Sequence, residues 1–265
     1  MEQARYKYIY GPVASWRFGK SLGIDPISRP EKTCTFDCVY CQAGKTRVFP
    51  KAREIFIPTE DLLEEVQSLP PMDLDTITFA GNGEPTLAKN LGEMIEGIKS
   101  FRNEKITVIT NASLINQKDV QEDLLLADLV VAKLDAFSEA SLNDVNQAMP
   151  NVLMHHIIQG LKDFRRIYRG RLALQIMFID ANKKYAAQIA DIVKEIRPDE
   201  IEINTPLRAC AVKPLPERDI LEITACFTKI GVESFRIRHV YEAPKKTSSP
   251  ICPQSTERRR GKEGV

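Results

Sequence analysis

The sequence predicts an α/β fold, and within that class a partial (β/α)6 barrel. Short apolar runs alternate with segments of helical periodicity from about residue 60 onward, which is the pattern of a parallel sheet flanked by helices. The 265 residues suffice for one barrel. About six strand-helix units are fewer than the eight of a closed barrel, so the predicted barrel is incomplete.

The predicted strands are short runs rich in apolar and β-branched residues, and the predicted helices carry apolar residues at helical spacing. We expect a first strand at Gly23–Ile27 and further strands at Thr76–Phe79, Ile106–Thr110, Leu129–Leu134, Leu172–Phe178, Ile201–Asn204 and Phe235–His239. We expect helices at Glu60–Leu69, Leu91–Phe101, Lys118–Leu126, Val152–Tyr168, Ala186–Ile196 and Glu217–Ile230.

No internal repeat, low-complexity linker or change in composition divides the chain. We therefore expect residues 1–240 to form the barrel with a Gly-rich N-terminal segment, and residues 241–265 to form a C-terminal extension that is mobile at its end. The one dense basic run, Arg258–Lys262, lies in this extension and is predicted to be solvated. Ser15–Arg17 and the extension are expected to help close the open side of the barrel.

Composition limits the class of protein. The net charge of +1 predicts no general attraction to nucleic acid. The first residues lead into no apolar run of signal-peptide length, and no later run reaches the roughly 18 residues of a membrane span, so we expect a cytoplasmic protein without a membrane span. Of the six cysteines, three are clustered and three are scattered, which is not the framework of a secreted disulfide protein. A reducing compartment is expected.

The clustered cysteines, Cys34, Cys38 and Cys41, have the spacing C-x3-C-x2-C, with the aromatic Tyr40 before the last of them. Three thiolates close in sequence can hold three irons of a [4Fe–4S] cluster and leave the fourth iron open to another ligand, whereas an electron-transfer cluster normally has four cysteine ligands. The alternative is zinc, but structural zinc sites use four ligands and no second cysteine pair is present. The spacing therefore favours an iron–sulfur cluster with an open iron.

Polar side chains follow the predicted strands at the edge of a parallel barrel where reactive groups lie. They are Glu84, which follows Gly83 in a glycine-containing turn, and then Asn111, Lys133, Asp135, Asn204 and Arg208 at or just after strand ends; Gln175 instead interrupts the apolar run of its strand. Simpler structural roles remain open: an ordinary loop for Gly83-Glu84, a turn for Asn111, an ion pair for Lys133 with Asp135, a bond to a neighbouring strand or water for Gln175, and a surface ion pair for Arg208.

Three motifs together carry a resemblance to a known family. They are Gly-Pro-Val…Ser-x-Arg-x-Gly-x-Ser-Leu-Gly at residues 11–23, Lys-Thr-Cys-x3-Cys-x-Tyr-Cys-Gln at residues 32–42, and Gly-x-Gly-Glu-Pro-Thr-Leu at residues 81–87. With them, roughly residues 8–240 resemble the radical S-adenosylmethionine (SAM) superfamily, and within it the wyosine-synthase-like iron–sulfur oxidoreductases in a short, single-cluster form.

The resemblance implies a fold, cofactors and site residues. The fold would be a partial TIM-type barrel of the radical SAM type, with SAM chelated to the open iron of the [4Fe–4S] cluster and cleaved by one electron to give a 5′-deoxyadenosyl radical. Reduced flavodoxin or ferredoxin would supply the electron. Expected SAM contacts are Tyr40 near the adenine, the backbone and the carboxylate of Gly83-Glu84 at the ammonium group, and Asn111, Lys133, Asp135, Gln175 and Asn204; expected substrate contacts are Arg17 and Arg208.

The substrate class follows less directly. Tricyclic wyosine synthases carry an additional N-terminal cysteine set and a lysine that engages pyruvate, whereas this chain has no cysteine before Cys34. Asn143–Ala148 also stands where relatives often have an Asn-Arg-Pro run. We therefore expect one cluster and a small or medium-sized substrate rather than tRNA. A tRNA-modifying enzyme and a non-catalytic metal-binding module are the alternatives, and the sequence leaves the oligomeric state open.

Overall fold

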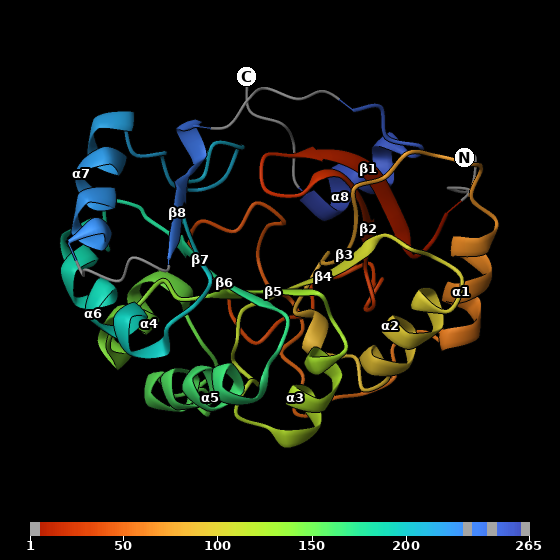
Figure 1. Ribbon diagram of the computed structural model, residues 1–265, viewed down its shortest axis with the longest axis horizontal. Coiled ribbons are helices and arrows are strands. Elements are labelled where there is room, and N and C mark those ends of the chain that lie inside the picture. Colours follow the sequence, from red (N-terminus) through yellow and green to blue (C-terminus); the bar gives the residue numbers. More distant parts are fainter. Residues whose placement is uncertain (1–5, 230–234, 243–247, 261–265) are drawn as a thin grey trace.

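The computed structural model describes residues 6–229, 235–242 and 248–260 (Figure 1). Within these residues, one sheet of eight strands curls into a half-barrel, and neighbouring strands in the sheet are also consecutive in the chain. β1 is antiparallel to β2, whereas β2 to β8 are parallel. The strands are β1 Ile9–Ser15, β2 Gly19–Ile24, β3 Thr76–Phe79, β4 Lys105–Thr110, β5 Leu129–Lys133, β6 Arg171–Met177, β7 Glu200–Asn204 and β8 Arg236–His239. The predicted α/β partial barrel is confirmed.

Helices cover the outside of the sheet. Figure 1 shows α1, α2, α3, α5, α6 and α7 arranged around it. The α-helices are α1 Thr59–Gln67, α2 Leu91–Lys99, α3 Lys118–Leu125, α4 Glu139–Asn146, α5 Met154–Ile167, α6 Ala186–Ile196, α7 Glu217–Thr228 and α8 Pro253–Arg260, and short 3-10 helices occupy Pro85–Leu87, Lys183–Tyr185 and Val240–Glu242. Among the described residues, no helix combines the length and apolar character needed to span a membrane.

The two faces of the sheet differ in polarity. Along β6, Leu172, Leu174 and Ile176 are fully buried in the main apolar cluster with residues of the surrounding helices. The intervening Gln175 faces the inside of the half-barrel, because successive side chains of a strand point to opposite faces. Glu202 on β7 is its neighbour in register and continues this polar inner face. The core therefore lies between sheet and helices, and the inside of the half-barrel is free to carry polar chemistry.

The turn between β1 and β2 contacts the opposite edge of the sheet. Arg17 pairs with Glu202, with Nη1 and Oε2 2.9 Å apart, and Arg238 of β8 donates from Nη2 to the carbonyl of Trp16 at 2.7 Å. The guanidinium of Arg238 also lies 5.1 Å from the centroid of the Trp16 ring. The hairpin thus spans the gap between the two edges of the half-barrel, and the expected role of Ser15–Arg17 in closing the substrate side stays a prediction.

The N-terminal region differs from the expectation. The sequence predicts one strand at Gly23–Ile27, but the structure has a hairpin whose second strand ends at Ile24. The chain turns there because Asp25 Oδ1 accepts hydrogen bonds from the backbone N–H groups of Ile27 and Ser28, at 3.2 and 3.1 Å. β1 is hidden in the sequence by Gly11 and Pro12, which disfavour a regular strand and lie at a change of register.

Two helices were not predicted. α4 is short and has only two large apolar buried side chains, Leu142 and Val145, but Ser138 and Ser141 cap its start reciprocally. α8 includes the basic run that was expected to be solvated, and this expectation is wrong for Arg259, whose side chain is fully buried. The predicted mobility of the chain end falls on residues 261–265, outside the described residues, as does the predicted end of the last barrel helix at Ile230.

Candidate functional site

The three clustered cysteines lie on the long loop between β2 and α1, over the carboxyl ends of the strands. The loop is held from two sides. At its start, Thr33 exchanges backbone hydrogen bonds with the turn after β3: its N–H donates to Asn82 O, and Glu84 N–H donates to Thr33 O, both at 3.2 Å. Farther on, Val39 N–H donates to Val145 O of α4 at 3.0 Å. The cysteine loop is therefore fixed to both β3 and α4.

Two amides point at the cysteine sulfurs. Asn111, at the end of β4, donates from Nδ2 to Cys34 Sγ at 3.6 Å, and Asn146, the last residue of α4, donates from Nδ2 to Cys38 Sγ at 3.4 Å. Burial, more than any other factor, raises the pKa of Cys34 to about 12 and that of Cys38 to about 11. Cys41 lies one turn from Cys38, with its N–H on the Cys38 carbonyl at 2.9 Å.

A buried lysine accompanies the cysteines. Lys32 is 6% exposed, and its ammonium donates to Gly44 O at 2.9 Å. Burial alone would lower the pKa of Lys32, but the neighbouring Cys41 and Cys34 outweigh it and raise this pKa. A cation at this position compensates the negative charge of thiolates in a low-dielectric site. The sequence analysis missed Lys32, although it stands only two residues before Cys34.

These surroundings fit an iron–sulfur cluster. The donor set is three thiols on one short loop, and hydrogen bonds to sulfur together with net charge are the features by which proteins tune such clusters. In the part of the chain that the structure describes, no group of three or more His, Cys, Asp or Glu side chains is arranged to hold a metal ion. The fit to an iron–sulfur cluster therefore rests on the three thiols and the side chains around them, and not on a preformed metal-binding geometry.

Gly83 and Glu84 lie in the turn after β3, which contacts the cysteine loop at Thr33. A Cβ atom at Gly83 would lie 2.0 Å from the carbonyl oxygen of Thr33, so only glycine allows this approach. The carboxylate of Glu84 is buried and accepts four hydrogen bonds: from Thr86 N–H at 3.1 Å, Thr86 Oγ1 at 2.7 Å, Thr110 Oγ1 at 2.6 Å and Asn111 N–H at 2.6 Å. Burial raises the pKa of Glu84, against the lowering effect of these bonds. Its carboxylate therefore joins β3 to β4.

The structure brings Tyr40, Lys133 and Asp135 together. Asp135 is the centre of this group: it accepts from Tyr40 OH, from Asn146 Nδ2 at 2.9 Å and from Met177 N–H at 2.7 Å. The Lys133 ammonium lies 3.5 Å from Asp135 and 5.0 Å from the centroid of the Tyr40 ring. Burial and then Asp135 raise the pKa of Tyr40 well above its usual value. Asn111, Lys133 and Asp135 line a cavity of about 10 Å³.

The remaining predicted residues are more dispersed. Gln175 is buried, and in the sheet it is paired in register with Lys133 of β5 and Glu202 of β7. The side-chain oxygen Oδ1 of Asn204 accepts a hydrogen bond from the N–H of Thr205 at 2.9 Å. Arg208 donates to the backbone carbonyl of Arg260 in α8. Arg17, in the turn before β2, pairs with Glu202 in the middle of β7. The expected substrate roles of Arg17 and Arg208 gain no support from these contacts.

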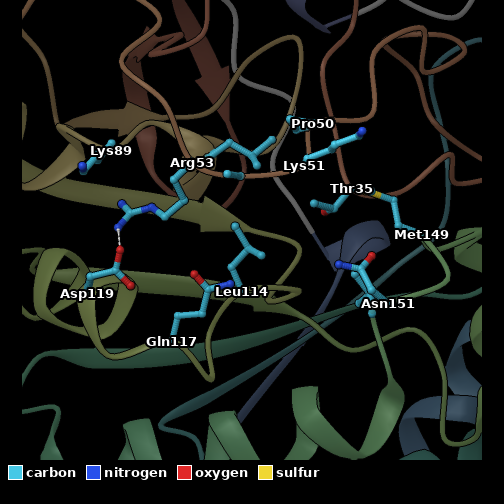
Figure 2. A pocket seen from close by; sticks show the side chains of 13 residues that line it. Thr35, Pro50, Lys51, Arg53, Lys89, Leu114, Gln117, Asp119, Met149 and Asn151 are labelled. Carbon is cyan, nitrogen blue, oxygen red and sulfur yellow. Dashed lines mark hydrogen bonds and ion pairs between the residues drawn. The ribbon is translucent and has the colours of Figure 1, made fainter.

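A larger cavity, about 340 Å³, lies beside Thr35 (Figure 2). Arg53 forms part of its wall and donates to Asp119 at 2.6 Å, as the dashed line in Figure 2 shows. The other contributors come from four loops at residues 50–52, 87–89, 114–117 and 149–152. None of the residues predicted to contact SAM lines this cavity.

Known proteins resemble this chain in sequence and in fold. Residues 30–202 match the profile of the radical SAM superfamily. A UPF0026 protein of Synechocystis sp. is 41% identical over 208 residues, which cover 78% of this chain and 77% of that protein. Among solved structures, Streptococcus suis SuiB bound to S-adenosylmethionine superposes with a TM-score of 0.61 at 16% identity, over 79% of this chain and 48% of that one.

The structure of archaeal TYW1 is similar in fold, with a TM-score of 0.58 at 15% identity, over 82% of this chain and 73% of that one. At such low identity, the likeness to both solved structures establishes the half-barrel fold alone. The profile match covers well over half of the chain, and the Synechocystis protein adds a relative matched over most of its own length. This chain is therefore an enzyme that belongs to the radical SAM superfamily.

Proposed function

We propose that this enzyme holds one [4Fe–4S] cluster on Cys34, Cys38 and Cys41 and uses it to cleave SAM reductively. When bound, the reduced cluster supplies one electron, which breaks a carbon–sulfur bond of SAM and leaves methionine and the 5′-deoxyadenosyl radical that removes a hydrogen atom from the substrate. The observation that carries the proposal is the cysteine loop itself, tied to Gly83 and Glu84 and surrounded by Asn111, Asn146 and Lys32. Membership of the superfamily implies an iron–sulfur cluster and SAM.

The side chains around the loop have distinct tasks in this proposal. Asn111 and Asn146 donate hydrogen bonds to two of the sulfurs, and Lys32 offsets negative charge. Burial of Cys34 and Tyr40 keeps water from the reactive centre. Glu84 holds the turn after β3 against the end of β4, so that the backbone of Gly83 and Glu84 is fixed in place.

The assignment of SAM contacts changes in one respect from the sequence expectation. Because the Glu84 carboxylate already has four protein donors, we assign the SAM ammonium to backbone carbonyls of Gly83 and Glu84 rather than to that carboxylate. Lys133 has three N–H donors and an acceptor only at 3.5 Å, which suits it to the SAM carboxylate. Tyr40, Asn111, Asp135, Gln175 and Asn204 remain proposed contacts.

We also propose a small or medium-sized substrate and an electron donor of the flavodoxin or ferredoxin type. The net charge of +1 supports the first proposal, because proteins that neutralise many phosphates usually carry a clear basic excess. Modification of tRNA, which the motif resemblance to wyosine-synthase-like enzymes implies, is the second candidate.

The test is anaerobic reconstitution followed by reduction with dithionite. The wild-type chain should bind about four irons and four sulfides, the [4Fe–4S] stoichiometry, and should slowly convert SAM to 5′-deoxyadenosine and methionine without substrate. Cys34→Ala, Cys38→Ala and Cys41→Ala should each lose both the cluster and the cleavage. The matched control is Cys226→Ala, which alters a cysteine on α7 whose thiol donates to the Glu222 carbonyl. Cluster loss in the control alone, or zinc without iron, would overturn the proposal.

A further inference from the structure

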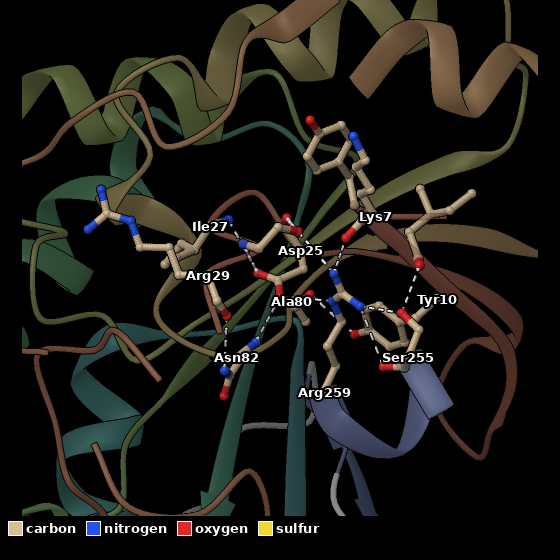
Figure 3. A network of polar contacts seen from close by, with 12 residues as sticks. Lys7, Tyr10, Asp25, Ile27, Arg29, Ala80, Asn82, Ser255 and Arg259 are labelled. Atoms are coloured by element: carbon tan, nitrogen blue, oxygen red, sulfur yellow. Dashed lines mark hydrogen bonds and ion pairs between the residues drawn. The ribbon is translucent and has the colours of Figure 1, made fainter. Parts of the chain in front are cut away.

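The C-terminal helix α8 carries a buried arginine to the carboxyl end of β2, next to the start of the cysteine loop (Figure 3). The Nε of Arg259 lies 2.9 Å from Asp25 Oδ2, and neither side chain of this pair is exposed by more than 1%. The helix itself is attached to β1: Gly11 N–H donates to Thr256 Oγ1 at 3.0 Å. A buried ion pair therefore connects two segments at opposite ends of the sequence.

The guanidinium of Arg259 has partners on several sides. Besides Asp25, it donates from Nη2 to the carbonyl of Lys7 and to Ser28 Oγ, the latter at 3.0 Å, and from Nη1 to Ser255 Oγ. Figure 3 shows Lys7, Asp25 and Ser255 around Arg259. A cation so completely enclosed is stable only because its donors are satisfied and its charge is paired.

Asp25 in turn fixes two loops of the proposed SAM site. Oδ1 accepts from the N–H groups of Ile27 and Ser28, at the start of the segment that leads to Cys34. Oδ2 accepts from the N–H of Asn82 at 3.3 Å, in the turn that contains Gly83. This turn lies so close to Asp25 that a Cβ at Gly81 would be 2.4 Å from Asp25 Cγ, so only glycine fits there. Asp25 thus sets the position of both loops, and Arg259 compensates its charge.

Tyr10 makes a second connection between the same elements. Its hydroxyl donates to the Ala80 carbonyl at 3.2 Å, directly before the Gly81–Gly83 turn, and its ring centroid lies 5.7 Å from the Arg259 guanidinium carbon. Burial raises the pKa of Tyr10 to about 12, so the hydroxyl keeps its proton and remains a donor.

We propose that Arg259 is a positioning residue for SAM binding: through Asp25 it holds the turn that carries Gly83 and Glu84 in the binding conformation. The SAM part of this inference rests on the proposed function. Without Arg259, the buried Asp25 carboxylate loses the cation that pairs with it, and the contacts by which it holds the two loops are weakened. The cysteines are held by separate contacts with Val48 and α4, so the loss should affect SAM more than iron.

The main variant is Arg259→Leu, which keeps an apolar side chain in the helix but removes the cation. We expect SAM to bind roughly tenfold more weakly or worse, as for a coupling between linked sites, while the iron content stays that of the wild type. Arg259→Lys keeps the positive charge beside Asp25 but loses the several N–H donors of the guanidinium. Its SAM affinity should lie between that of the wild type and that of Arg259→Leu. The matched control is Arg258→Leu, one residue away on the exposed side of α8.

Loss of overall stability is separated from loss of positioning by a second control. Tyr168→Phe removes a buried hydrogen bond to the Ala127 carbonyl, 2.8 Å long and on the far side of the core, and should lower stability without changing SAM affinity. Binding is measured by equilibrium dialysis with labelled SAM, at a temperature where circular dichroism shows each variant folded. Wild-type SAM affinity in folded Arg259→Leu, or an equal loss in Tyr168→Phe, would overturn the proposal.

Hydrogen exchange provides a readout that needs neither cluster nor SAM. In Arg259→Leu, the backbone amides of Ile27, Ser28 and Asn82 should exchange faster than in the wild type, while those of β5 and β6 stay protected. Unchanged exchange at these three amides would overturn the link through Asp25. A failure of the proposed function appears elsewhere, as a wild-type chain that does not bind or cleave SAM, and the exchange result decides the Arg259 link in either case.

Discussion

Glu84 illustrates, at the scale of single residues, how one buried carboxylate can connect two segments of the chain. Its four hydrogen bonds come from Thr86, in the turn after β3, and from Thr110 and Asn111 at the end of β4, so the two segments share one acceptor. The same arrangement makes Asn111 rigid, because its N–H is bound to Glu84 and its side chain is bound to Thr35 at 2.8 Å. In the proposed site, Glu84 therefore positions the backbone that binds SAM.

The first prediction concerns Glu84. Glu84→Ala should lower the free energy of unfolding by about 2–4 kcal/mol, since it leaves several buried donors without an acceptor. Glu84→Gln should lose less stability, because the amide oxygen can still accept hydrogen bonds from the buried donors. Some loss remains, because the NH₂ group then faces the N–H of Asn111, which is also a donor. Urea denaturation measures both, with the exposed Glu64→Ala of α1 as a control expected within about 0.5 kcal/mol of the wild type. Wild-type stability in Glu84→Ala would contradict this account.

The second prediction concerns Asn146, whose amide donates to Cys38 Sγ, Tyr40 OH and Asp135. Hydrogen bonds to the sulfurs stabilise the more negative, reduced state of an iron–sulfur cluster. Asn146→Ala should therefore shift the midpoint potential of the reconstituted cluster to a more negative value. Potentiometric titration followed by electron paramagnetic resonance measures the shift, and the exposed Asn143→Ala on the same helix should show none. An unchanged potential in Asn146→Ala would rule out the tuning role.

The sequence predicts only part of this site, for reasons that differ from residue to residue. The cysteine spacing is local, so Cys34, Cys38 and Cys41 can be recognised without any fold. Asn146 lies 108 residues after Cys38, and no local pattern connects the two. Glu84 could be recognised by its turn, but its carboxylate was expected to face the cofactor, since sequence does not reveal how many protein donors surround a buried acid.

At the scale of elements, the β1–β2 hairpin closes the half-barrel through one ion pair. The Glu202 side chain is 2% exposed, and burial raises its pKa while Arg17 lowers it. The pair joins the turn before β2 to the middle of β7, which are neighbours neither in sequence nor in the sheet. Removal of Arg17 alone therefore leaves the buried acid without its ion-pair partner.

The third prediction follows from this pair. Arg17→Ala should destabilise the fold by about 3–5 kcal/mol near neutral pH, the cost of breaking a buried ion pair. Lys20→Ala, which breaks an exposed pair with Asp73 on the same hairpin, should cost at most about 1 kcal/mol. Loss of Arg17 raises the folded-state pKa of Glu202 further above its unfolded value. As pH falls, the folded variant therefore takes up this proton at a higher pH than the unfolded chain does. The stability gap to the wild type should narrow as pH falls through that pKa towards 4.5.

Urea denaturation at several pH values tests the account of Arg17. A gap that stays constant with pH, or a loss no larger than that of Lys20→Ala, would show that Glu202 does not depend on Arg17.

Elements with a regular repeat of apolar residues could be predicted from the sequence, whereas elements held by polar contacts could not. The strand Thr76–Phe79 has the predicted bounds, and the helix Ala186–Ile196 does as well, because each has an uninterrupted apolar pattern. β1 contains Gly11 and Pro12, and its burial depends on α8, more than 230 residues later. α8 itself is polar all round, so its burial comes from Arg259 and its hydrogen bonds rather than from an apolar face.

At the scale of the whole molecule, acidic and basic side chains nearly balance, with 37 Lys and Arg against 36 Asp and Glu. Several of the arginines are committed to internal pairs, as Arg53 is with Asp119 and Asp123. The basic run of α8 is also partly internal, since Arg259 is buried. The surface is therefore poorer in available cations than the composition alone implies.

The fourth prediction is that the full chain does not bind bulk tRNA saturably at about 150 mM salt, because few phosphates can be neutralised. Fluorescence anisotropy across salt concentrations measures this. A chain ending at Pro250 is unsuitable for the comparison, because it removes Arg259 from the core. Lys51→Ala, on the exposed part of the cysteine loop, is the informative variant. tRNA modification would be favoured instead if the wild type bound saturably and if Lys51→Ala lowered the slope of the logarithm of the binding constant against the logarithm of the salt concentration by about one.

The pairing of Asp25 with Arg259 also bears on the order of events during synthesis. The two residues are 234 positions apart, so Arg259 is added roughly 12 to 47 seconds after Asp25 at 5–20 residues per second. In that interval the cysteines and the turn that carries Gly83 already exist, but Asp25 still lacks Arg259 as its partner. A nascent chain can thus form the contacts between Asp25 and Asn82 before this ion pair, and the pair itself forms only after α8 has been synthesised.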